Sequence, residues 1–271
     1  MAMIVASLFL LATALPVFSS AHYVESSPHG WCSIDINYPQ LSGLADTSLQ
    51  SLINRRLYHA FVELPERDYS YASYFDAFGS TVDHPSMTDC EKRMVSLTVS
   101  MRKDKFGSAA LHASYDVSEW YRIGSGGESL FSFVGDGVEA VYPSAHPTDY
   151  WWTVNIDMSD GKVLGFNDIF RTDVTHAKRL DDLIAASLHR YPDAAEDHLV
   201  SSFRNKDLRG RPQPLVCPGG ITFFNLIDVH AMAAVAAFVS RDDLIAAGVV
   251  KNPLVLEAIK EPRRAGSSNC G

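Results

Sequence analysis

The 271-residue sequence lacks most of the motifs that identify a class of enzyme or binding protein. It contains no Walker loop, no GxSxG and no HExxH motif, so the signatures of P-loop proteins, α/β-hydrolases and zincins are absent. It contains no CxxC pair, which argues against a zinc ribbon or a thioredoxin site. It has no long basic run and a net charge of −9, and such a chain is a poor partner for the phosphate backbone of nucleic acids.

The composition itself is that of a globular protein. Hydrophobic residues make up 46% and charged residues 20% of the chain, which excludes a disordered or collagen-like protein. At about 150 residues per domain, the length predicts one large domain or two small ones. A chain of this size buries roughly three quarters of its unfolded surface. The acidity favours solubility and a weak attraction to cationic partners.

The N-terminus has the pattern of a secretory signal peptide. Residues 4–15 contain no charge and have the length of a signal's apolar core, whereas a membrane span needs about 20 apolar residues. Ser19 and Ala21 place small residues at the −3 and −1 positions of a cleavage before His22, and removal of 21 of the 271 residues leaves a chain of 250. No Lys or Arg precedes the apolar run, and a buried N-terminal helix is the alternative. We therefore expect a periplasmic or secreted product without a membrane span in the mature chain.

The next segments predict a strand, a helix and a second strand. Residues 33–38 alternate polar and apolar side chains, which predicts a half-buried strand that ends at Pro39. Apolar residues recur at helical spacing over residues 49–64. Alternation over residues 94–102 predicts the second strand. If the helix is a crossover connection, the two strands run parallel and begin side by side.

Four widely spaced cysteines fit an oxidising compartment. Cys32 and Cys90 lie at or just before the starts of the two predicted strands, and we therefore expect a disulfide between them. Cys217 and Cys270 then pair by elimination. Four free buried thiols are the alternative.

The rest of the chain reads as mixed α and β structure. Strands are expected over residues 110–121, 130–134, 138–142 and 150–158, with a glycine-containing interruption at 135–137 and a hairpin turn at 159–162. Two helices follow between residues 174 and 203, then a strand at 221–224, a segment of helical composition at 229–239, a short helix at 242–247 and a polar tail.

No catalytic constellation stands out. His146 lies in a loop near Trp151 and Trp152, where it is a candidate ligand or general base, although a histidine held by a backbone hydrogen bond is the more common case. Trp151 and Trp152 are adjacent on a predicted strand, so their side chains point to opposite faces, and at least one is expected in the core. Asp157 and Asp160 flank the predicted hairpin turn, and Asp160 and Asp168 are more simply explained by turn chemistry.

Several short motifs, in a constant order, resemble one bacterial family. They are Ile36-Asn37-Tyr38-Pro39-Gln40-Leu41, Ile53-Asn54, Tyr142-Pro143-Ser144-Ala145-His146-Pro147, Trp152-Thr153-Val154-Asn155-Ile156-Asp157, Asp160-Gly161-Lys162-Val163-Leu164, Asn167-Asp168-Ile169-Phe170 and Gly220-Ile221-Thr222-Phe223-Phe224. The family is the extracytoplasmic domain of unknown function found in the lysozyme-sensing anti-sigma factor of Gram-positive bacteria. A related domain precedes the catalytic part of a peptidoglycan deacetylase.

The resemblance implies an α+β fold with mixed or antiparallel sheets, helices packed on one face, and two half-domains. It also implies strand and turn at residues 229–239, against their helix propensity. The family has Gly-Gly-Ala-His where this chain has Pro143-Ser144-Ala145-His146, so two glycines that shape that loop are missing. A direct anti-sigma role does not transfer, because a membrane anchor and a sigma-binding segment are not found in the sequence.

We therefore predict a signal peptide at residues 1–21, half-domains at 22–145 and 146–259, and a polar tail at 260–271. The expected function is a non-catalytic binding module for a lysozyme-like protein or a peptidoglycan glycan, with no cofactor, no metal and no nucleic acid. An envelope glycan-modifying enzyme that uses His146 with Asp157 or Asp168 is the alternative, and a purely structural envelope protein is a third hypothesis. The candidate binding residues are Tyr142, His146, Tyr150, Trp151, Trp152 and Asp157.

Overall fold

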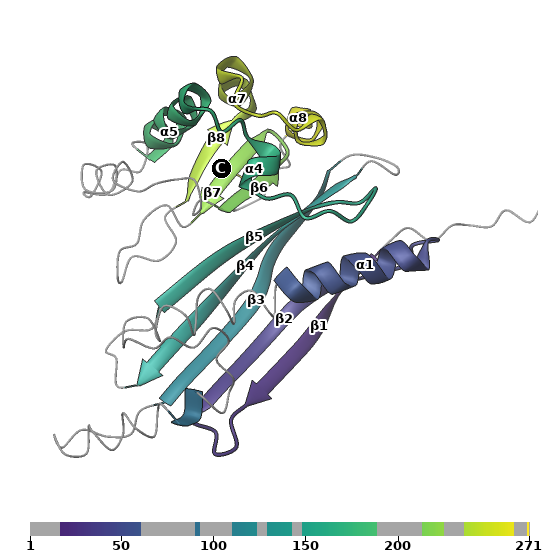
Figure 1. Ribbon diagram of the computed structural model, residues 1–271, viewed down its shortest axis with the longest axis vertical. Coiled ribbons are helices and arrows are strands. Elements are labelled where there is room, and N and C mark those ends of the chain that lie inside the picture. The colour runs from purple at the N-terminus through teal and green to yellow at the C-terminus, as the bar shows by residue number, and fades with distance from the viewer. Residues whose placement is uncertain are drawn as a thin grey trace, which may run out of the picture.

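The computed structural model describes residues 17–60, 90–92, 110–123, 129–142, 148–188, 213–224, 236–262 and 270. Their strands form a five-stranded sheet of order β1-β2-β3-β4-β5 and a three-stranded sheet of order β6-β7-β8. Figure 1 shows α1 along one face of the large sheet, and the small sheet with its helices gathered beside β5. The elements are β1 (Val17–Ser26), β2 (Cys32–Ser42), α1 (Thr47–Tyr58), β3 (Ala110–Ile123), β4 (Leu130–Tyr142), β5 (Thr148–Asp157), α4 (Phe166–Ile169), α5 (Val174–Leu188), β6 (Gln213–Cys217), β7 (Gly220–Phe224), β8 (Ala237–Ser240), α7 (Arg241–Ala247) and α8 (Pro253–Lys260).

The predicted α+β class is confirmed. In the large sheet β2 and β3 run parallel, and the other neighbouring pairs run antiparallel. The parallel pair is possible because the chain between β2 and β3 includes α1 and is long enough to cross over. The predicted strand at residues 94–102 lies outside the described residues, so the parallel neighbour of β2 in this structure is β3.

β2 continues through Pro39 to Ser42, so the prediction that the strand ends at Pro39 is wrong. β3 pairs with β2 only from Cys32 to Ile36, whereas β1 pairs with β2 along its whole length. Around Pro39, β1 is therefore the one strand paired with β2 among the described residues. A proline is tolerated at such an edge, because its missing N–H interrupts no ladder on the unpaired side.

α1 packs its apolar face on the large sheet. Asp46 Oδ1 caps the helix by accepting hydrogen bonds from the backbone N–H groups of Ser48 and Leu49, both at 2.9 Å. Ile53 and Leu57 are fully buried, in one cluster with apolar residues of β2, β4 and β5. The α-helix ends at Tyr58 and residues 61–64 lie outside the described range, so the predicted helix is confirmed only for its first part.

β4 is one continuous strand, so the prediction of an interruption at residues 135–137 is wrong. In the antiparallel register with β5, Gly135 lies opposite Trp152 and Gly137 opposite Tyr150. Glycine weakens a strand but does not end it, so the two glycines are compatible with a continuous β4. β5 belongs to the five-stranded sheet, although it lies after the predicted half-domain boundary at residues 145–146.

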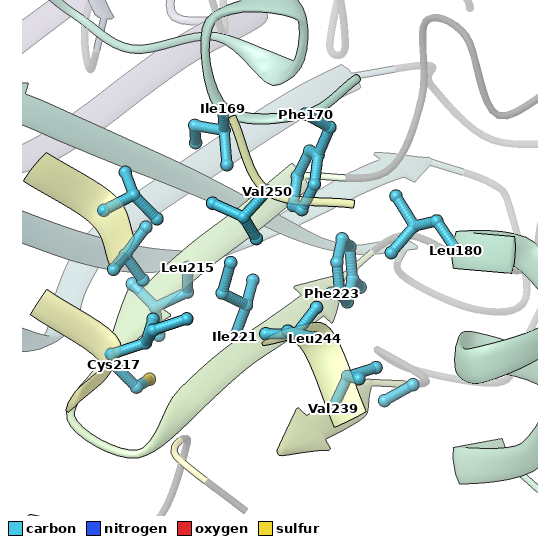
Figure 2. Close-up of a cluster of buried hydrophobic side chains, with 14 of the residues drawn as sticks. Ile169, Phe170, Leu180, Leu215, Cys217, Ile221, Phe223, Val239, Leu244 and Val250 are labelled. Atoms are coloured by element: carbon cyan, nitrogen blue, oxygen red, sulfur yellow. The ribbon is translucent and has the colours of Figure 1, made fainter. Parts of the chain in front are cut away.

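The small sheet and helices α5, α7 and α8 form the C-terminal layer, and the large sheet and α1 form the N-terminal layer. The C-terminal layer has its own apolar core, shown in Figure 2. All five residues of β7 are buried, and they pack with buried residues of α5, α7 and α8. The predicted strand at 221–224 and short helix at 242–247 are confirmed as β7 and α7. Residues 237–240 form β8, as the family resemblance implies, while residues 225–235 lie outside the described range. The sequence interpretation missed α8, which begins at Pro253 behind the capping side chain of Asn252.

Both expected disulfides are present. Cys32–Cys90 ties the start of β2 to a segment 58 residues further along the chain. Cys217–Cys270 ties the end of β6 to the C-terminal tail, 53 residues away. All four cysteines are at most 1% exposed, so both disulfides are buried.

Candidate binding surface

Of the predicted aromatic site residues, the structure describes the side chain of Trp151, which packs in the protein. The half-buried Trp151 stacks on Phe224 of β7, with ring centroids 5.3 Å apart and planes at 6°. Trp151 therefore joins the two sheets, and the expectation of at least one core tryptophan is met by this residue. For Tyr142, Tyr150 and Trp152 the structure describes only the backbone positions in β4 and β5. His146 lies outside the described residues.

Asp157 is the last residue of β5, and its side chain reaches into the turn that follows. Its Oδ1 accepts hydrogen bonds from the backbone N–H and the hydroxyl of Ser159, at 2.9 and 2.6 Å. In the same turn Gly161 has φ +68°, and a Cβ there would lie 2.9 Å from Ile53 of α1. Arg56 of α1 also donates to the carbonyl of Gly161. The turn thus packs against α1, and Asp157 shapes it.

Asp168 connects this turn to α4. One carboxylate oxygen accepts from Lys162 Nζ at 2.5 Å, and the other accepts from the backbone N–H of Gly165 at 3.0 Å. The hydrogen bond from Lys162 is the largest cause that lowers the pKa of Asp168. Both carboxylates of the enzyme hypothesis are therefore engaged in local structure.

Asn155 joins the two sheets through a buried network. Its side-chain oxygen accepts from the Ser132 hydroxyl at 2.8 Å and from the backbone N–H of Val216 at 3.0 Å. Its Nδ2 donates to the Pro214 carbonyl at 2.6 Å, and Asn155 is only 2% exposed. The half-buried Thr153 donates to the same carbonyl at 2.9 Å. The amide therefore completes the backbone hydrogen bonding of β6 from within β5.

Asn54 has the corresponding role between α1 and β2. Its oxygen accepts from the backbone N–H of Leu41 at 2.7 Å, and its Nδ2 donates to the carbonyl of Leu41 at 2.9 Å. The amide thus mimics a strand neighbour for the end of β2, where β3 no longer pairs with it. Asn54, Asn155 and Asp168 all belong to the family-like motifs, and in this structure each of them supports the fold.

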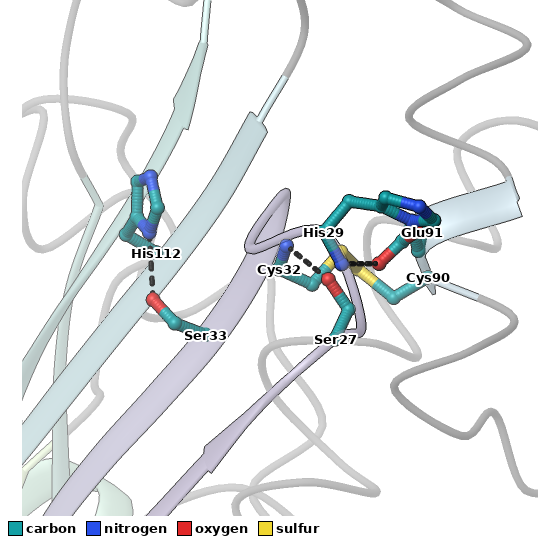
Figure 3. Close-up of a disulfide and its surroundings, with 7 residues drawn as sticks. All are labelled: Ser27, His29, Cys32, Ser33, Cys90, Glu91 and His112. Carbon is teal, nitrogen blue, oxygen red and sulfur yellow. Dashed lines mark hydrogen bonds and ion pairs between the residues drawn. A yellow bond between two sulfur atoms is a disulfide. The ribbon is translucent and has the colours of Figure 1, made fainter.

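A polar cluster stands beside the Cys32–Cys90 disulfide (Figure 3). The Glu91 carboxylate accepts from the backbone N–H of His29 at 3.0 Å and pairs with the His29 ring. The backbone hydrogen bond from His29 and then the side-chain hydrogen bond from Ser27 lower the pKa of Glu91 to about 2. Ser27 Oγ also accepts from the Cys32 N–H at 3.0 Å. The cluster holds the β1–β2 turn against the segment that carries Cys90.

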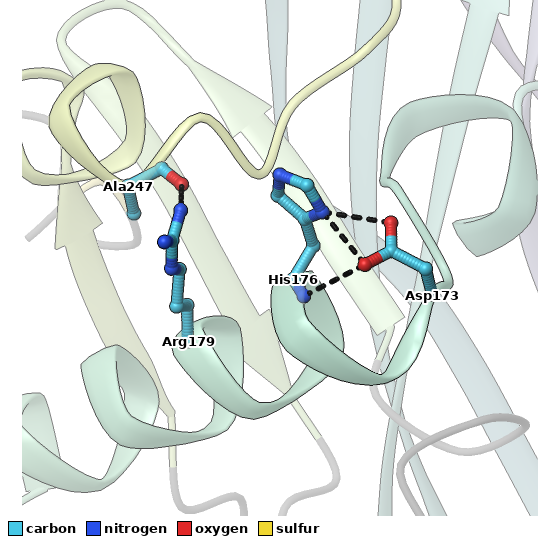
Figure 4. A network of polar contacts seen from close by, with 4 residues as sticks. All are labelled: Asp173, His176, Arg179 and Ala247. Atoms are coloured by element: carbon cyan, nitrogen blue, oxygen red, sulfur yellow. Dashed lines mark hydrogen bonds and ion pairs between the residues drawn. The ribbon is translucent and has the colours of Figure 1, made fainter.

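A second cluster orients the start of α5 (Figure 4). Asp173 accepts from the backbone N–H of His176 at 3.2 Å and pairs with the His176 ring. The side-chain hydrogen bond from His176 is the largest cause that lowers the pKa of Asp173. Arg179 donates to the Ala247 carbonyl at 3.2 Å, which links α5 to α7. These contacts cap and pack helices.

The face of β1, β2 and β3 that points away from α1 is different. Ile34 and Ile36 face α1, so strand alternation directs Ser33, Asp35 and Asn37 to the opposite face. We call the polar residues of this surface the open polar face; they are His22, Ser33, Asp35, Asn37, His112 and Ser114. The exposed Val24 lies among them, opposite Asp35. His22, Asp35, His112 and Ser114 are exposed, and Ser33 and Asn37 are half-buried.

The polar side chains of this face are ordered by one another across the strands. His22 Nε2 of β1 lies 2.8 Å from Asp35 Oδ1 of β2, and the two side chains are 57% and 53% exposed. Ser33 Oγ of β2 lies 2.6 Å from His112 Nδ1 of β3 (Figure 3). Neighbouring hydroxyl, imidazole and carboxylate groups on an exposed sheet face are suited to hydrogen bonding with a macromolecular surface.

Sequence reasoning placed residues 33–38 in a half-buried strand but did not single out its polar positions as a candidate site. The alternation was the available signal, yet it gives no information about the neighbours of a strand. His22 and His112 are 90 positions apart along the chain, and only the sheet order brings them to one face. Among the described residues, no group of three or more His, Cys, Asp or Glu is arranged to hold a metal ion. None of the described helices is long and apolar enough to cross a membrane.

Comparison with known proteins gives a fold. No family model and no curated protein matches the sequence. A solved structure of a DUF3298 family member from Bacteroides fragilis aligns with a TM-score of 0.60 at 17% identity, covering 92% of this chain and 98% of that one. A DUF3298 family protein from Pseudomonas aeruginosa aligns at 14% identity over 92% and 97% of the two chains, with a TM-score of 0.43 that is too low to establish a shared fold. The structural neighbours thus belong to a family of unknown function, and the first shares the α+β fold.

Proposed function

We propose that this chain is an extracytoplasmic, non-catalytic binding module that contacts a cell-wall-related ligand through the open polar face. The observation that carries the proposal is the contrast between that face and the other polar clusters. The side chains of Asn54, Asn155 and Asp168 hydrogen-bond to backbone groups of the fold. The His22–Asp35 and Ser33–His112 pairs instead join side chains of neighbouring strands on an exposed sheet surface, where His22 and Asp35 are 57% and 53% exposed.

The export part of the proposal rests on redox chemistry and on the N-terminus. Both disulfides are buried, and no free cysteine occurs among the described residues. Disulfides of this kind persist in oxidising compartments. The apolar run at residues 4–15 supplies a signal for export, so a periplasmic or secreted location is the consistent one.

A cationic protein of the lysozyme kind is the partner we favour. An exposed face that extends over three strands offers area to a protein, whereas small ligands prefer concave sites. The chain has a net charge of −9, which attracts a cationic protein over a distance of about one Debye length. The family resemblance supports the same class. A peptidoglycan glycan is the other cell-wall ligand, and the hydroxyl, amide and imidazole groups of the face are compatible with sugar hydroxyls.

The enzyme alternative has less support. Asp157 and Asp168 are both engaged in the turn and cap beside α1, where their hydrogen bonds have a structural purpose. A hydrolase would need a carboxylate or histidine aimed at a substrate within hydrogen-bond reach. We therefore propose binding without catalysis.

The experiment is calorimetric titration of the purified, disulfide-bonded protein with lysozyme and with soluble peptidoglycan fragments, each at low and at moderate salt. Specific protein recognition predicts lysozyme binding that survives moderate salt, since nonspecific attraction is screened. Binding of the fragments alone would move the ligand class to the glycan. Binding of neither ligand would contradict the proposal.

A matched pair of charge reversals tests the surface. Asp35→Lys changes the open polar face, and Asp182→Lys changes the exposed Lys178–Asp182 pair on α5. Both variants alter the net charge equally, so general steering is the same in both. We expect Asp35→Lys to weaken lysozyme binding at least tenfold and Asp182→Lys to weaken it less than threefold. Equal effects would show that only overall charge matters.

A further inference from the structure

The start of β1 overlaps the leader that the sequence predicts. Cleavage before His22 would remove residues 17–21, which are the first five residues of β1. These residues pair in register with β2, from Val17 opposite Ser42 to Ala21 opposite Tyr38. The Ser42 hydroxyl donates to the Val17 carbonyl at 3.3 Å, so the side chains also support this half of the strand pair.

Phe18 is the residue whose removal matters most. Its ring centroid lies 4.4 Å from that of Phe131 and 5.0 Å from that of Phe133 in β4. Phe131 and Phe133 are 1% and 0% exposed. A cut before His22 would remove the Phe18 ring from its contacts with both of these buried rings, in the apolar cluster that all three share.

The same cut would also remove the described strand that pairs with the end of β2. β3 pairs with β2 only as far as Ile36, so residues 38–42 have β1 as their paired strand among the described elements. Unpaired backbone groups at a sheet edge are a liability that folded proteins avoid. The fold therefore uses residues 17–21 as part of its N-terminal layer.

We infer that the leader is cut after Ala14, so that the mature chain begins at Leu15 and keeps the whole of β1. Ala12, Thr13 and Ala14 form an A-x-A sequence, the form that signal cleavage sites prefer. Residues 4–11 still provide an apolar core of the length that a signal needs. This inference rests on the export part of the proposed function. It keeps His22 in the middle of a strand, where it pairs with Asp35 on the open polar face.

The test is the N-terminus of the exported protein. The full chain is expressed with its own N-terminus in an exporting bacterium, purified from the periplasm or medium, and measured by intact mass and N-terminal sequencing. We expect Leu15 as first residue, from removal of 14 of the 271 residues. A first residue of His22 would overturn the inference and leave export intact. An uncut chain would overturn the export proposal and the inference together.

Two alanine substitutions locate the cleavage independently. Ala14→Gln puts a larger residue at the inferred cleavage position, and Ala21→Gln does the same at the alternative position. We expect Ala14→Gln to accumulate uncut precursor and Ala21→Gln to be processed as the unaltered chain is. The reverse result would overturn the inference.

A stability comparison tests the structural reason. Chains that begin at Leu15 and at His22 are exported behind an unrelated signal peptide, and their thermal unfolding is measured with a Phe18→Ala variant of the longer chain. We expect the shorter chain to unfold about 10 °C lower, and Phe18→Ala to account for much of the loss. Equal melting temperatures would contradict a structural role for residues 17–21.

Discussion

The two sheets of this protein use their faces differently. All five residues of β7 in the small sheet are buried, since helices and the large sheet cover both of its faces. β2 in the large sheet instead alternates, with Ile34 and Ile36 fully buried and Asp35 about half exposed. A sheet covered on both faces contributes to stability, whereas a sheet with one open face keeps a surface for another molecule. The small sheet and its helices therefore form a closed core, and the exposed face of β1, β2 and β3 is the surface on which the binding proposal depends.

Removal of each disulfide has the largest expected effect and compares the two layers directly. The loops closed by Cys32–Cys90 and Cys217–Cys270 span 58 and 53 residues. In the chain-entropy account, loops of this size each stabilise the fold by about 4 kcal/mol. We expect Cys32→Ser/Cys90→Ser and Cys217→Ser/Cys270→Ser to lose similar free energies of unfolding in denaturant titrations. A difference of more than about 2 kcal/mol would show that one layer depends on its bond for reasons other than loop length.

The two motif asparagines come next. Asn155→Ala leaves the Val216 N–H and the Ser132 hydroxyl without their acceptor inside the protein, and we expect a loss of about 3 kcal/mol. Asn54→Ala is the matched control, because it removes the same amide from a half-buried site, and we expect about 1.5 kcal/mol. Denaturant unfolding followed by tryptophan fluorescence measures both. Equal losses would contradict the assignment of Asn155 as the link between the sheets.

Glu91 gives a pH dependence to the N-terminal layer. Its pKa is lowered from 4.5 to about 2 in the folded protein, so the folded state binds a proton less readily than the unfolded one. The contribution to stability is therefore complete above about pH 4.5 and is lost as the pH falls toward 2. We expect Glu91→Gln to be less stable than the unaltered protein at pH 6 and to approach it at pH 2, as measured by denaturant titrations across this range. A stability difference independent of pH would contradict the carboxylate assignment.

Substitution on the open polar face has the smallest expected effect on stability. Ser114 lies on this face, and Ser51 is an exposed residue of α1 on the other side of the sheet. We expect Ser114→Arg and Ser51→Arg to change the free energy of unfolding by less than about 0.5 kcal/mol each. Ser114→Arg alone should weaken lysozyme binding at least tenfold in calorimetry. Equal loss of lysozyme binding in both variants would contradict the assignment of the binding site to the open polar face.

The sequence predicted much of the fold because its patterns are local. Alternation identified residues 33–38 as a strand, and helical spacing identified the region of α1. The Cys32–Cys90 pairing is confirmed, but it was inferred from a parallel strand at residues 94–102 that lies outside the described residues, whereas the parallel neighbour of β2 is β3. Cys217–Cys270 was inferred by elimination and is also confirmed. The prediction was wrong where the structure of a segment depends on which strands lie beside it. Pro39 lies within β2 because β3 has already separated there, which no local pattern reports.

The candidate surface was harder to predict for the same reason. Trp151 looked available for a ligand, but its stacking on Phe224 is a contact between segments 73 positions apart. Asp157 was a candidate binding residue, but its carboxylate accepts a hydrogen bond from the backbone of the turn that follows β5. The open polar face is assembled from three strands, and its pairs His22–Asp35 and Ser33–His112 depend on sheet order and register. Sequence spacing carries information about faces within an element but little about which elements are adjacent.

Histidine footprinting tests the central claim most directly. Carbethoxylation of the protein, read out peptide by peptide in a mass spectrometer, is compared with and without saturating lysozyme. His22 and His112 report on the open polar face, and His176 of α5 is the internal control. We predict that lysozyme protects His22 and His112 and leaves the modification of His176 unchanged. Unchanged modification of His22 and His112 at saturation would contradict the assignment of this face as the binding surface.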